Sequence, residues 1–281
     1  MITDYTTTKR TGTAIRLILA EDDAINQQVT KKILTRFGYQ VDVANNGSEA
    51  VTLLEKNDYA LVLMDCMMPV LDGYDTTSII RNQASNVRNH AIPVIALTGN
   101  AYKEYRDGCL AAGMNDFLAK PIDIADLLTM LEKWLPADAS PEYAQPIVQK
   151  AVMNEYGTPS PCHDVFDRPD FVKRNLDNFV LSRSIAMVFV DSRPEYFLSI
   201  CAALESQDID GLIKASHKLK GAAANLALPL LSETVRLIES SAISGDLGKA
   251  GQLLPELEEQ FNLAESAIRR WLLSPQERDS Q

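Results

Sequence analysis

Short apolar runs alternate with segments of helical length through the first half of the chain, and this alternation limits the fold more than any other feature. Five runs have the length of buried strands: Leu17–Ala20, Val41–Ala44, Ala60–Met64, Val94–Leu97 and Phe117–Ala119. Strands that alternate with helices form a parallel sheet with both faces covered. We therefore predict a doubly wound α/β domain with a five-stranded parallel sheet. Its ligands should bind just beyond the carboxyl ends of the strands.

Helical patterns fill the intervals between the apolar runs. Apolar residues recur at every fourth position from Ile25 to Phe37, and Gly38 follows as a stop signal. Ser48 is expected to cap the next helix. The other helices of this half are predicted over Glu49–Lys56, Tyr74–Arg81, Tyr102–Ala112 and Ile122–Leu135.

The second half of the chain has a different character. Prolines punctuate residues 136–161, which lack clear periodicity, so we interpret 137–165 as a semi-extended linker. Amphipathic helical patterns follow and predict an all-α four-helix-bundle domain over 166–275, after a first domain over 13–136. The helix-start signals expected in this half are Ser192-Arg193-Pro194, Asp208, Pro229 and Pro255.

Composition excludes several classes of function. The chain has 281 residues and a formal net charge of -11. This charge argues against sequence-independent binding to nucleic acid or to an anionic membrane. No apolar run approaches the roughly 18–20 residues that span a bilayer, and the N-terminus does not look like a signal peptide. The four cysteines show no metal-binding spacing and are interpreted as reduced thiols. We expect a cytoplasmic protein.

Polar residues that suit phosphoryl transfer follow four of the predicted strands. Glu21-Asp22-Asp23 follows the first strand and Asp65 ends the third, so several carboxylates meet at one edge of the sheet. Their mutual repulsion and their oxygen-only character favour Mg²⁺. Thr98 adds a hydroxyl group and Lys120 an ammonium group at the same edge. A carboxylate nucleophile, a metal site, a hydroxyl and a cation together favour phosphoryl transfer.

Four sequence stretches carry a resemblance to a known family: LILAEDD, LVLMDCMMPVLDG, VIALTGN and DFLAKP. Residues 15–135 resemble the flavodoxin-like receiver domain of two-component response regulators. The resemblance implies that Asp65 is the phosphoryl acceptor and that Thr98 and Lys120 bind the phosphoryl oxygens. It further implies a cis Lys120–Pro121 bond and an aromatic switch residue at Phe117. The implied Mg²⁺ ligands are Glu21, Asp22, Asp65 and the main-chain carbonyl of Met67.

His217 is one of only three histidines in the chain and lies in the stretch SHKLKGAAANL. A helical projection places a buried stripe along Leu212, Ser216, Leu219, Ala223 and Leu226 and puts His217 off that stripe. Gly221 and Ala224 border the imidazole, and Lys220 lies one turn away. A surface histidine without a role is the plainer interpretation, yet a mid-helix glycine beside it favours a docking site.

The same stretch resembles the His-x-Leu-Lys-Gly signature of histidine-containing phosphotransfer (HPt) domains, over about residues 166–273. The resemblance implies that His217 is the phosphohistidine acceptor and that Lys220 and Gly221 support the site. Ala222 stands where Ser is frequent, and Ala227 stands where Gly is common. His90 and His163 are assigned to exposed connections.

The two resemblances imply a two-component phosphorelay intermediate. A sensor histidine kinase, Asp65, His217 and a downstream response-regulator receiver would exchange one phosphoryl group, with Mg²⁺ as cofactor. The sequence contains no G-x-x-x-x-G-K-[ST] loop and no DNA-reading motif, so no ATP-binding kinase domain or nucleic-acid partner is expected and the enzyme class stays open.

Three alternatives remain open. The chain could be the C-terminal signalling part of a hybrid sensor histidine kinase, whose catalytic context would then be that of a histidine kinase. It could be a phosphate-independent interaction module. A Mg²⁺-dependent phosphatase with Asp65 as nucleophile is a third alternative, although such enzymes usually need a second Asp two residues on, where this chain has Met67.

Overall fold

A five-stranded parallel sheet forms the centre of the first domain, as predicted. The computed structural model describes residues 15–99, 103–135, 165–175 and 177–274. The strands are ordered β2-β1-β3-β4-β5 in the sheet. Their bounds are β1 Arg16–Ala20, β2 Gln40–Ala44, β3 Leu61–Asp65, β4 Val94–Thr98 and β5 Asp116–Ala119. All four pairings are parallel, so every strand delivers its carboxyl end to the same edge.

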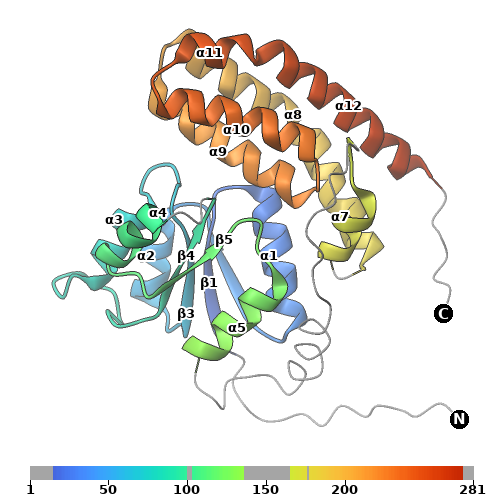
Figure 1. The fold of residues 1–281 in the computed structure, drawn as a ribbon. Coiled ribbons are helices and arrows are strands. Elements are labelled where there is room, and N and C mark those ends of the chain that lie inside the picture. The colour runs from blue at the N-terminus through green and yellow to red at the C-terminus, as the bar shows by residue number, and fades with distance from the viewer. Residues whose placement is uncertain (1–14, 100–102, 136–164, 176, 275–281) are drawn as a thin grey trace, which may run out of the picture.

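Helices cover both faces of the sheet (Figure 1). Leu17 and Leu19 of β1 face the apolar cluster shared with α1 and α5, whereas Ile18 and Ala20 face the cluster shared with α2, α3 and α4. This division follows from the alternation of side chains along a strand. The helix bounds are α1 Ala24–Arg36, α2 Gly47–Lys56, α3 Gly73–Arg81, α4 Lys103–Ala111 and α5 Ile124–Trp134.

The start of α2 corrects one sequence prediction. Ser48 was expected to cap this helix, but the cap is Asn46, whose backbone is extended at φ −165° and whose side chain accepts a hydrogen bond of 2.9 Å from the Glu49 amide. The Glu49 carboxylate reaches back to the Asn45 amide at 2.9 Å. These reciprocal bonds satisfy amides at the helix start, so Ser48 lies inside the first turn.

The second domain is a bundle of four long helices, which confirms the predicted class. They are α8 Phe179–Glu205, α9 Ile209–Asn225, α10 Pro229–Ile243 and α12 Leu254–Leu273. Two short helices that the sequence did not predict accompany them, α7 Arg168–Arg174 and α11 Leu247–Gln252. Asp208 caps α9, and Pro229 and Pro255 lie in the first turns of α10 and α12, as predicted.

Pro194 does not start a helix, contrary to prediction, but lies inside α8. An interior proline costs roughly 3 kcal/mol because it removes one backbone hydrogen bond and crowds the preceding turn. Buried residues on both sides of it, including Phe189 and Tyr196, pack into the apolar core. We infer that this packing holds the helix continuous across the proline.

The bundle lies over the carboxyl-end edge of the sheet (Figure 1). Helix α1 of the first domain contacts α8 and α9 of the second. The apolar cluster on the α1 face continues into the bundle, so the two domains share one core. The predicted linker 137–165, with Cys162 and His163, falls outside the described residues apart from its last residue. Across the described parts of the chain, every helix is too short or too polar to span a membrane.

Replacement of Pro194 by Ala should stabilise the chain. The substitution restores an amide donor in the interior of α8 at an exposed position, and the free energy of unfolding should rise by about 1–3 kcal/mol. Urea unfolding measures this change. Asp191→Ala, an exposed position in the same helix, is the control and should stay within roughly 0.5 kcal/mol. Equal stability of Pro194→Ala and wild type would show that α8 carries no such penalty.

Candidate functional site

Three carboxylates meet at the carboxyl-end edge of the sheet. Glu21 and Asp22 follow β1 and Asp65 ends β3, and one oxygen from each lies within 4.8 Å of the others. Because β1 and β3 are neighbours in the sheet, Ala20 pairs with Met64 and the next residues of both strands lie side by side. Glu21 and Asp65 are almost completely buried. The parallel register therefore assembles the cluster that the sequence predicted.

The Lys120 ammonium group lies in the middle of this cluster. Its Nζ is 2.6 Å from Glu21 Oε2 and 2.7 Å from Asp65 Oδ2. The resemblance assigns Lys120 to the phosphoryl oxygens, and in this structure its ammonium group is already paired with two carboxylates. The following bond, Lys120–Pro121, is cis, as the family resemblance implied.

Burial governs the electrostatics of the cluster. Desolvation, reinforced by Asp65, raises the pKa of Glu21 to about 8 against the opposing charge of Lys120. Burial and the Asp65 charge also raise the pKa of Asp22 to about 6. Burial by itself would lower the pKa of Lys120, but Asp65 and Glu21 outweigh it and raise that pKa. The site thus holds more negative charge than one ammonium group neutralises, which favours a further cation.

Thr98 and Met67 complete this edge of the sheet. Thr98 ends β4 and is buried. The Met67 amide donates a 3.2 Å hydrogen bond to Asp65 Oδ1, so the backbone after β3 holds the acidic side chain in place. Phe117 of β5 is partly buried against the apolar cluster on the α2–α4 face.

His217 lies on α9 as the sequence indicated, with all five residues of the predicted stripe buried and its own side chain 13% exposed. The Glu239 carboxylate of α10 binds both the His217 imidazole and the Lys220 ammonium group. Its Oε1 is 2.9 Å from His217 Nδ1 and its Oε2 is 2.5 Å from Lys220 Nζ. Burial alone would raise the pKa of Glu239, but these two partners lower it, so the carboxylate is ionised.

The bond to Glu239 decides which ring nitrogen of His217 can react. A carboxylate accepts a hydrogen bond from Nδ1–H, which leaves the lone pair of the neutral ring on Nε2. The resemblance gives Lys220 a supporting role at the site, and in this structure its ammonium group is bound to Glu239. Glu239 therefore orients the imidazole and holds the neighbouring ammonium group in place.

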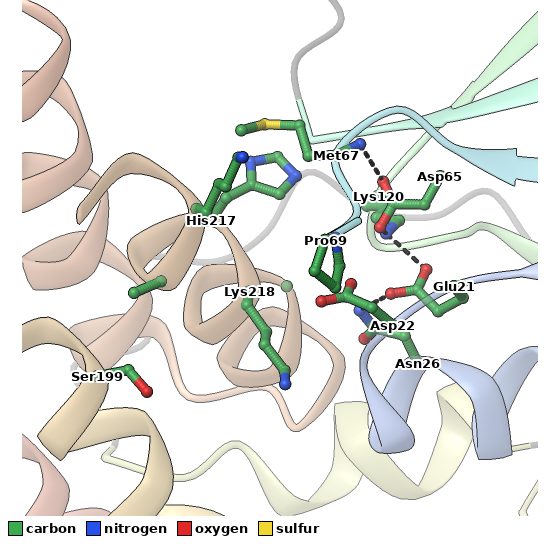
Figure 2. A pocket seen from close by; sticks show the side chains of 13 residues that line it. Glu21, Asp22, Asn26, Asp65, Met67, Pro69, Lys120, Ser199, His217 and Lys218 are labelled. Atoms are coloured by element: carbon green, nitrogen blue, oxygen red, sulfur yellow. Dashed lines mark hydrogen bonds and ion pairs between the residues drawn. The ribbon is translucent and has the colours of Figure 1, made fainter. Parts of the chain in front are cut away.

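The acidic cluster and His217 face one cavity of about 170 Å³ (Figure 2). Its walls include Asp65, Lys120 and Met67 from the first domain and His217, Lys218 and Gly221 from the second. The approach is close at Gly99, just after β4, where an added Cβ would lie 2.5 Å from His217 Cε1. An added Cβ at Gly221 would lie 3.2 Å from Asn26 Nδ2. Both glycines leave room for the contact between the domains.

Two hydrogen bonds from α1 to the bundle flank this cavity. The Tyr196 hydroxyl donates to Asp23 Oδ2 at 2.5 Å in a buried setting. Burial and the Asp23 charge raise the pKa of Tyr196, so its hydroxyl keeps its proton. Asn26 donates to Glu21 Oε1 at 2.9 Å and accepts from Asn225 Nδ2 at 2.6 Å. A chain of hydrogen bonds thus runs from a carboxylate of the cluster to α9.

Sequence reasoning named Asp65 and His217, which line one cavity in the structure, but it missed the residues that connect them. Asp23 was grouped with the acidic cluster, yet its Oδ1 caps α1 and its other oxygen binds Tyr196. Glu239, Asn26 and Asn225 gave no motif signal. The one signal for Glu239 is a charged residue among the buried positions of α10, where it is 5% exposed.

Comparison with protein families agrees with this geometry. Residues 17–132 match the model described as "Response regulator receiver domain", and residues 184–271 match the model described as "Hpt domain". The chain therefore contains a receiver domain over 17–132 followed by an Hpt domain over 184–271.

Several curated proteins are similar to the chain. The aerobic respiration control sensor protein ArcB of Escherichia coli is 27% identical over 262 residues, which are 92% of this chain and 32% of ArcB. The histidine-protein kinase BarA of Shigella flexneri is 27% identical and covers 91% of this chain. Hybrid signal transduction histidine kinase B of Dictyostelium discoideum is 40% identical over 126 residues. The chain covers less than a third of the length of each of these relatives.

Two similar solved structures each cover less than half of the chain. The receiver domain of sensor histidine kinase PA1611 from Pseudomonas aeruginosa is 43% identical, with a TM-score of 0.40, over 43% of this chain and 98% of that one. A co-crystal structure of Saccharomyces cerevisiae Ypd1 with the receiver domain of Ssk1 is 25% identical, with a TM-score of 0.40, over 46% of this chain and 94% of that one.

Gly99→Ala should weaken the contact between the two domains. The added methyl group would overlap the imidazole, and overpacking of this kind costs about 1–3 kcal/mol, so the equilibrium constant for docking should fall roughly fivefold or more. Small-angle X-ray scattering of the full chain should report a larger radius of gyration.

Gly251→Ala in α11, where an added Cβ meets nothing within 4 Å, is the matched control and should leave the radius unchanged. His217→Ala combined with Gly99→Ala should restore the compact form. An unchanged radius in Gly99→Ala alone would contradict the close approach at this glycine.

Proposed function

We propose that the chain is a phosphorelay intermediate that passes a phosphoryl group between Asp65 and His217. The observation that carries the proposal is that both side chains line the same 170 Å³ cavity although 152 positions separate them in sequence (217 − 65). A carboxylate beside a lysine and an imidazole with one free nitrogen are the two groups needed for such an exchange.

The carboxylate cluster suits Mg²⁺. Octahedral Mg²⁺ at about 2.1 Å holds its ligand oxygens about 3–4 Å apart, so the three carboxylates, now within 4.8 Å, need only small rotations. Glu21, Asp22, Asp65 and the Met67 carbonyl are the proposed ligands, and the excess negative charge supports the assignment. When bound, Mg²⁺ would neutralise charge on the phosphoryl oxygens. Thr98 and Lys120 would bind those same oxygens.

Transfer from Asp65 to His217 balances without another reactant. The Nε2 lone pair attacks phosphorus, the bond from phosphorus to the Asp65 oxygen breaks, and Asp65 leaves as a carboxylate. The imidazole gains positive charge, which the ionised Glu239 stabilises at Nδ1–H. Lys120 holds the departing carboxylate. The reverse reaction uses the same groups.

The docked arrangement supports transfer within one chain. Asp23–Tyr196 and Asn26–Asn225 join the domains beside the cavity, and Gly99 and Gly221 permit the close approach. In this assignment the receiver unit spans 13–136, a linker spans 137–165 and the Hpt unit spans 166–275. Lys220 would leave Glu239 and bind the phosphoryl group once it is attached to His217.

Partners of the relay are assigned by their chemistry. A sensor histidine kinase would supply the phosphoryl group to Asp65, and a downstream receiver would accept it from His217. The match of 92% of this chain to 32% of ArcB supports the second candidate, that the chain is the C-terminal part of a hybrid kinase. We also propose a cytoplasmic location, which fits both a phosphorelay intermediate and the C-terminal part of a hybrid kinase.

Phosphorylation with acetyl phosphate tests the proposal. With Mg²⁺, the wild-type chain should carry hydroxylamine-sensitive label on Asp65 and acid-labile label on His217, and without Mg²⁺ it should carry almost none. Asp65→Asn should lose both labels, because the receiver feeds the histidine. His217→Gln should keep only the label on Asp65. Peptide mapping assigns the sites.

Mixing experiments separate transfer within a chain from transfer between chains. Labelled His217→Gln mixed with Asp65→Asn can pass the group only between molecules, so its rate should depend on concentration and be slower than wild type. Absence of label from the wild-type chain, or equal label in both variants, would overturn the relay. A phosphate-independent module would take up no label at all.

Loss of the α1 contacts should slow transfer without affecting the acceptor. Tyr196→Phe removes the hydroxyl group that binds the Asp23 carboxylate, a bond worth about 1.5–3 kcal/mol, so transfer from Asp65 to His217 should slow roughly tenfold or more. Initial labelling of Asp65 by acetyl phosphate should stay within about twofold of wild type, since it needs no docking. Rapid-quench kinetics measures both steps.

Tyr59→Phe is the matched control for this variant. The Tyr59 hydroxyl donates to Asp42 at 2.8 Å entirely within the receiver domain, so the same chemical deletion leaves the interface intact. Asn225→Asp should act like Tyr196→Phe, because it sets an acceptor against Asn26 Oδ1. Transfer as fast in both interface variants as in Tyr59→Phe would show that these bonds do not guide docking.

A further inference from the structure

Two buried cysteines lie in contact next to the acceptor. Cys66 directly follows Asp65 at the end of β3, and Cys109 lies in α4. Their sulfur atoms are 3.7 Å apart. The Tyr74 hydroxyl of α3 is 3.9 Å from the Cys109 sulfur. The relay chemistry uses neither thiol, so the pair is a separate chemical feature of the molecule.

The pair is reachable although both side chains are buried. Cys66 lines a pocket of about 340 Å³, whose wall also includes Tyr74, Thr98 and His217. A small oxidant that enters between the two domains can therefore meet the Cys66 sulfur. Cys109 is 1% exposed and lies behind it, in contact with it.

We propose that Cys66 and Cys109 form a dithiol site that a peroxide oxidises to a disulfide, and that this bond restrains the segment carrying Asp65. Hydrogen peroxide first oxidises one of the two thiols to a sulfenic acid and is itself reduced to water. The other thiol then attacks that sulfur, and a second water leaves. The two thiols lose two electrons in total, and the peroxide gains them. An external thiol reverses the reaction.

The geometry needs only a short approach. The sulfur atoms must move from 3.7 Å to about 2.0 Å, through rotation of the two side chains and a shift of α4. The backbone at the end of β3, next to Cys66, is held more firmly than helix α4, which carries Cys109. The Cys66 amide donates to the Leu97 carbonyl and the Cys66 carbonyl accepts from the Gly73 amide, each at 3.2 Å. The bond would therefore draw α4 toward the strand end.

The consequence for Asp65 follows from its place in the chain. Asp65, Cys66 and Met67 are consecutive, and the Met67 amide holds the Asp65 side chain. A covalent tie at Cys66 limits how this segment adjusts to a phosphoryl group. The disulfide itself stands apart from the proposed function, whereas its effect on labelling rests on that function.

The test uses the full chain with Cys162 and Cys201 replaced by Ser, which leaves only the pair among the four cysteines. After treatment with hydrogen peroxide, intact mass should fall by two hydrogens, and peptide mapping should recover a link between Cys66 and Cys109. The initial rate of Asp65 labelling by acetyl phosphate should fall roughly fivefold or more, and dithiothreitol should restore it.

Cys109→Ala in the same background is the matched control. Its Cys66 should give a sulfenic acid that dimedone traps, with no loss of two hydrogens, and peroxide should leave its labelling rate within twofold of the untreated variant. Failure to form the link at peroxide doses that oxidise Cys201 in the wild-type chain would overturn the site. A link without slower labelling would overturn its effect on Asp65. Absence of label from the reduced chain would instead count against the proposed function.

Discussion

The ion pairs of Lys120 with Glu21 and Asp65 are the interaction on which the rest of the site depends. Three buried or partly buried carboxylates at one sheet edge repel each other, and the ammonium group at 2.6 Å and 2.7 Å offsets part of that repulsion. Removing one partner of a buried pair typically costs about 3–5 kcal/mol, because the remaining charge is left uncompensated. The same excess of negative charge that makes the edge costly to bury makes it a good place for a metal cation.

The bundle contacts this charged edge through a few hydrogen bonds, which extend the hydrogen bonds of the carboxylate cluster into the second domain. Asn26 binds Glu21 on one side and Asn225 on the other, so its orientation is fixed by both domains. Asp23 combines a local task, the cap of α1, with a bond to Tyr196 in the second domain. Because an N-cap position is rigid, Asp23 presents a fixed acceptor to the bundle. The elements that begin the receiver's first helix therefore also orient the Hpt domain.

His217 illustrates how the helical domain orients the side chain that we propose as the phosphoryl acceptor. The stripe of Leu212, Ser216 and Leu219 fixes the rotation of α9, and that rotation presents the imidazole to the first domain. Glu239 on α10 then holds Nδ1 and leaves Nε2 for chemistry. Local periodicity places the histidine, whereas a residue 22 positions away, 239 − 217, decides its tautomer.

By itself the sequence determined three things: which polar residues follow each strand at the sheet edge, which face of its helix carries His217, and the classes of the two domains. These three depend on local periodicity and on the residue types that follow each strand. Both can be seen in the sequence without knowledge of any tertiary contact. It misplaced the cap of α2 and the start of α8, because Asn46 and Ser48 look equally able to cap, and because core packing overrides the break expected at Pro194. Only the tertiary structure decided the pairing of Lys120, the roles of Asn26 and Glu239, and the meeting of Asp65 with His217. Those contacts join residues far apart in the chain, and their geometry depends on how two packed domains meet.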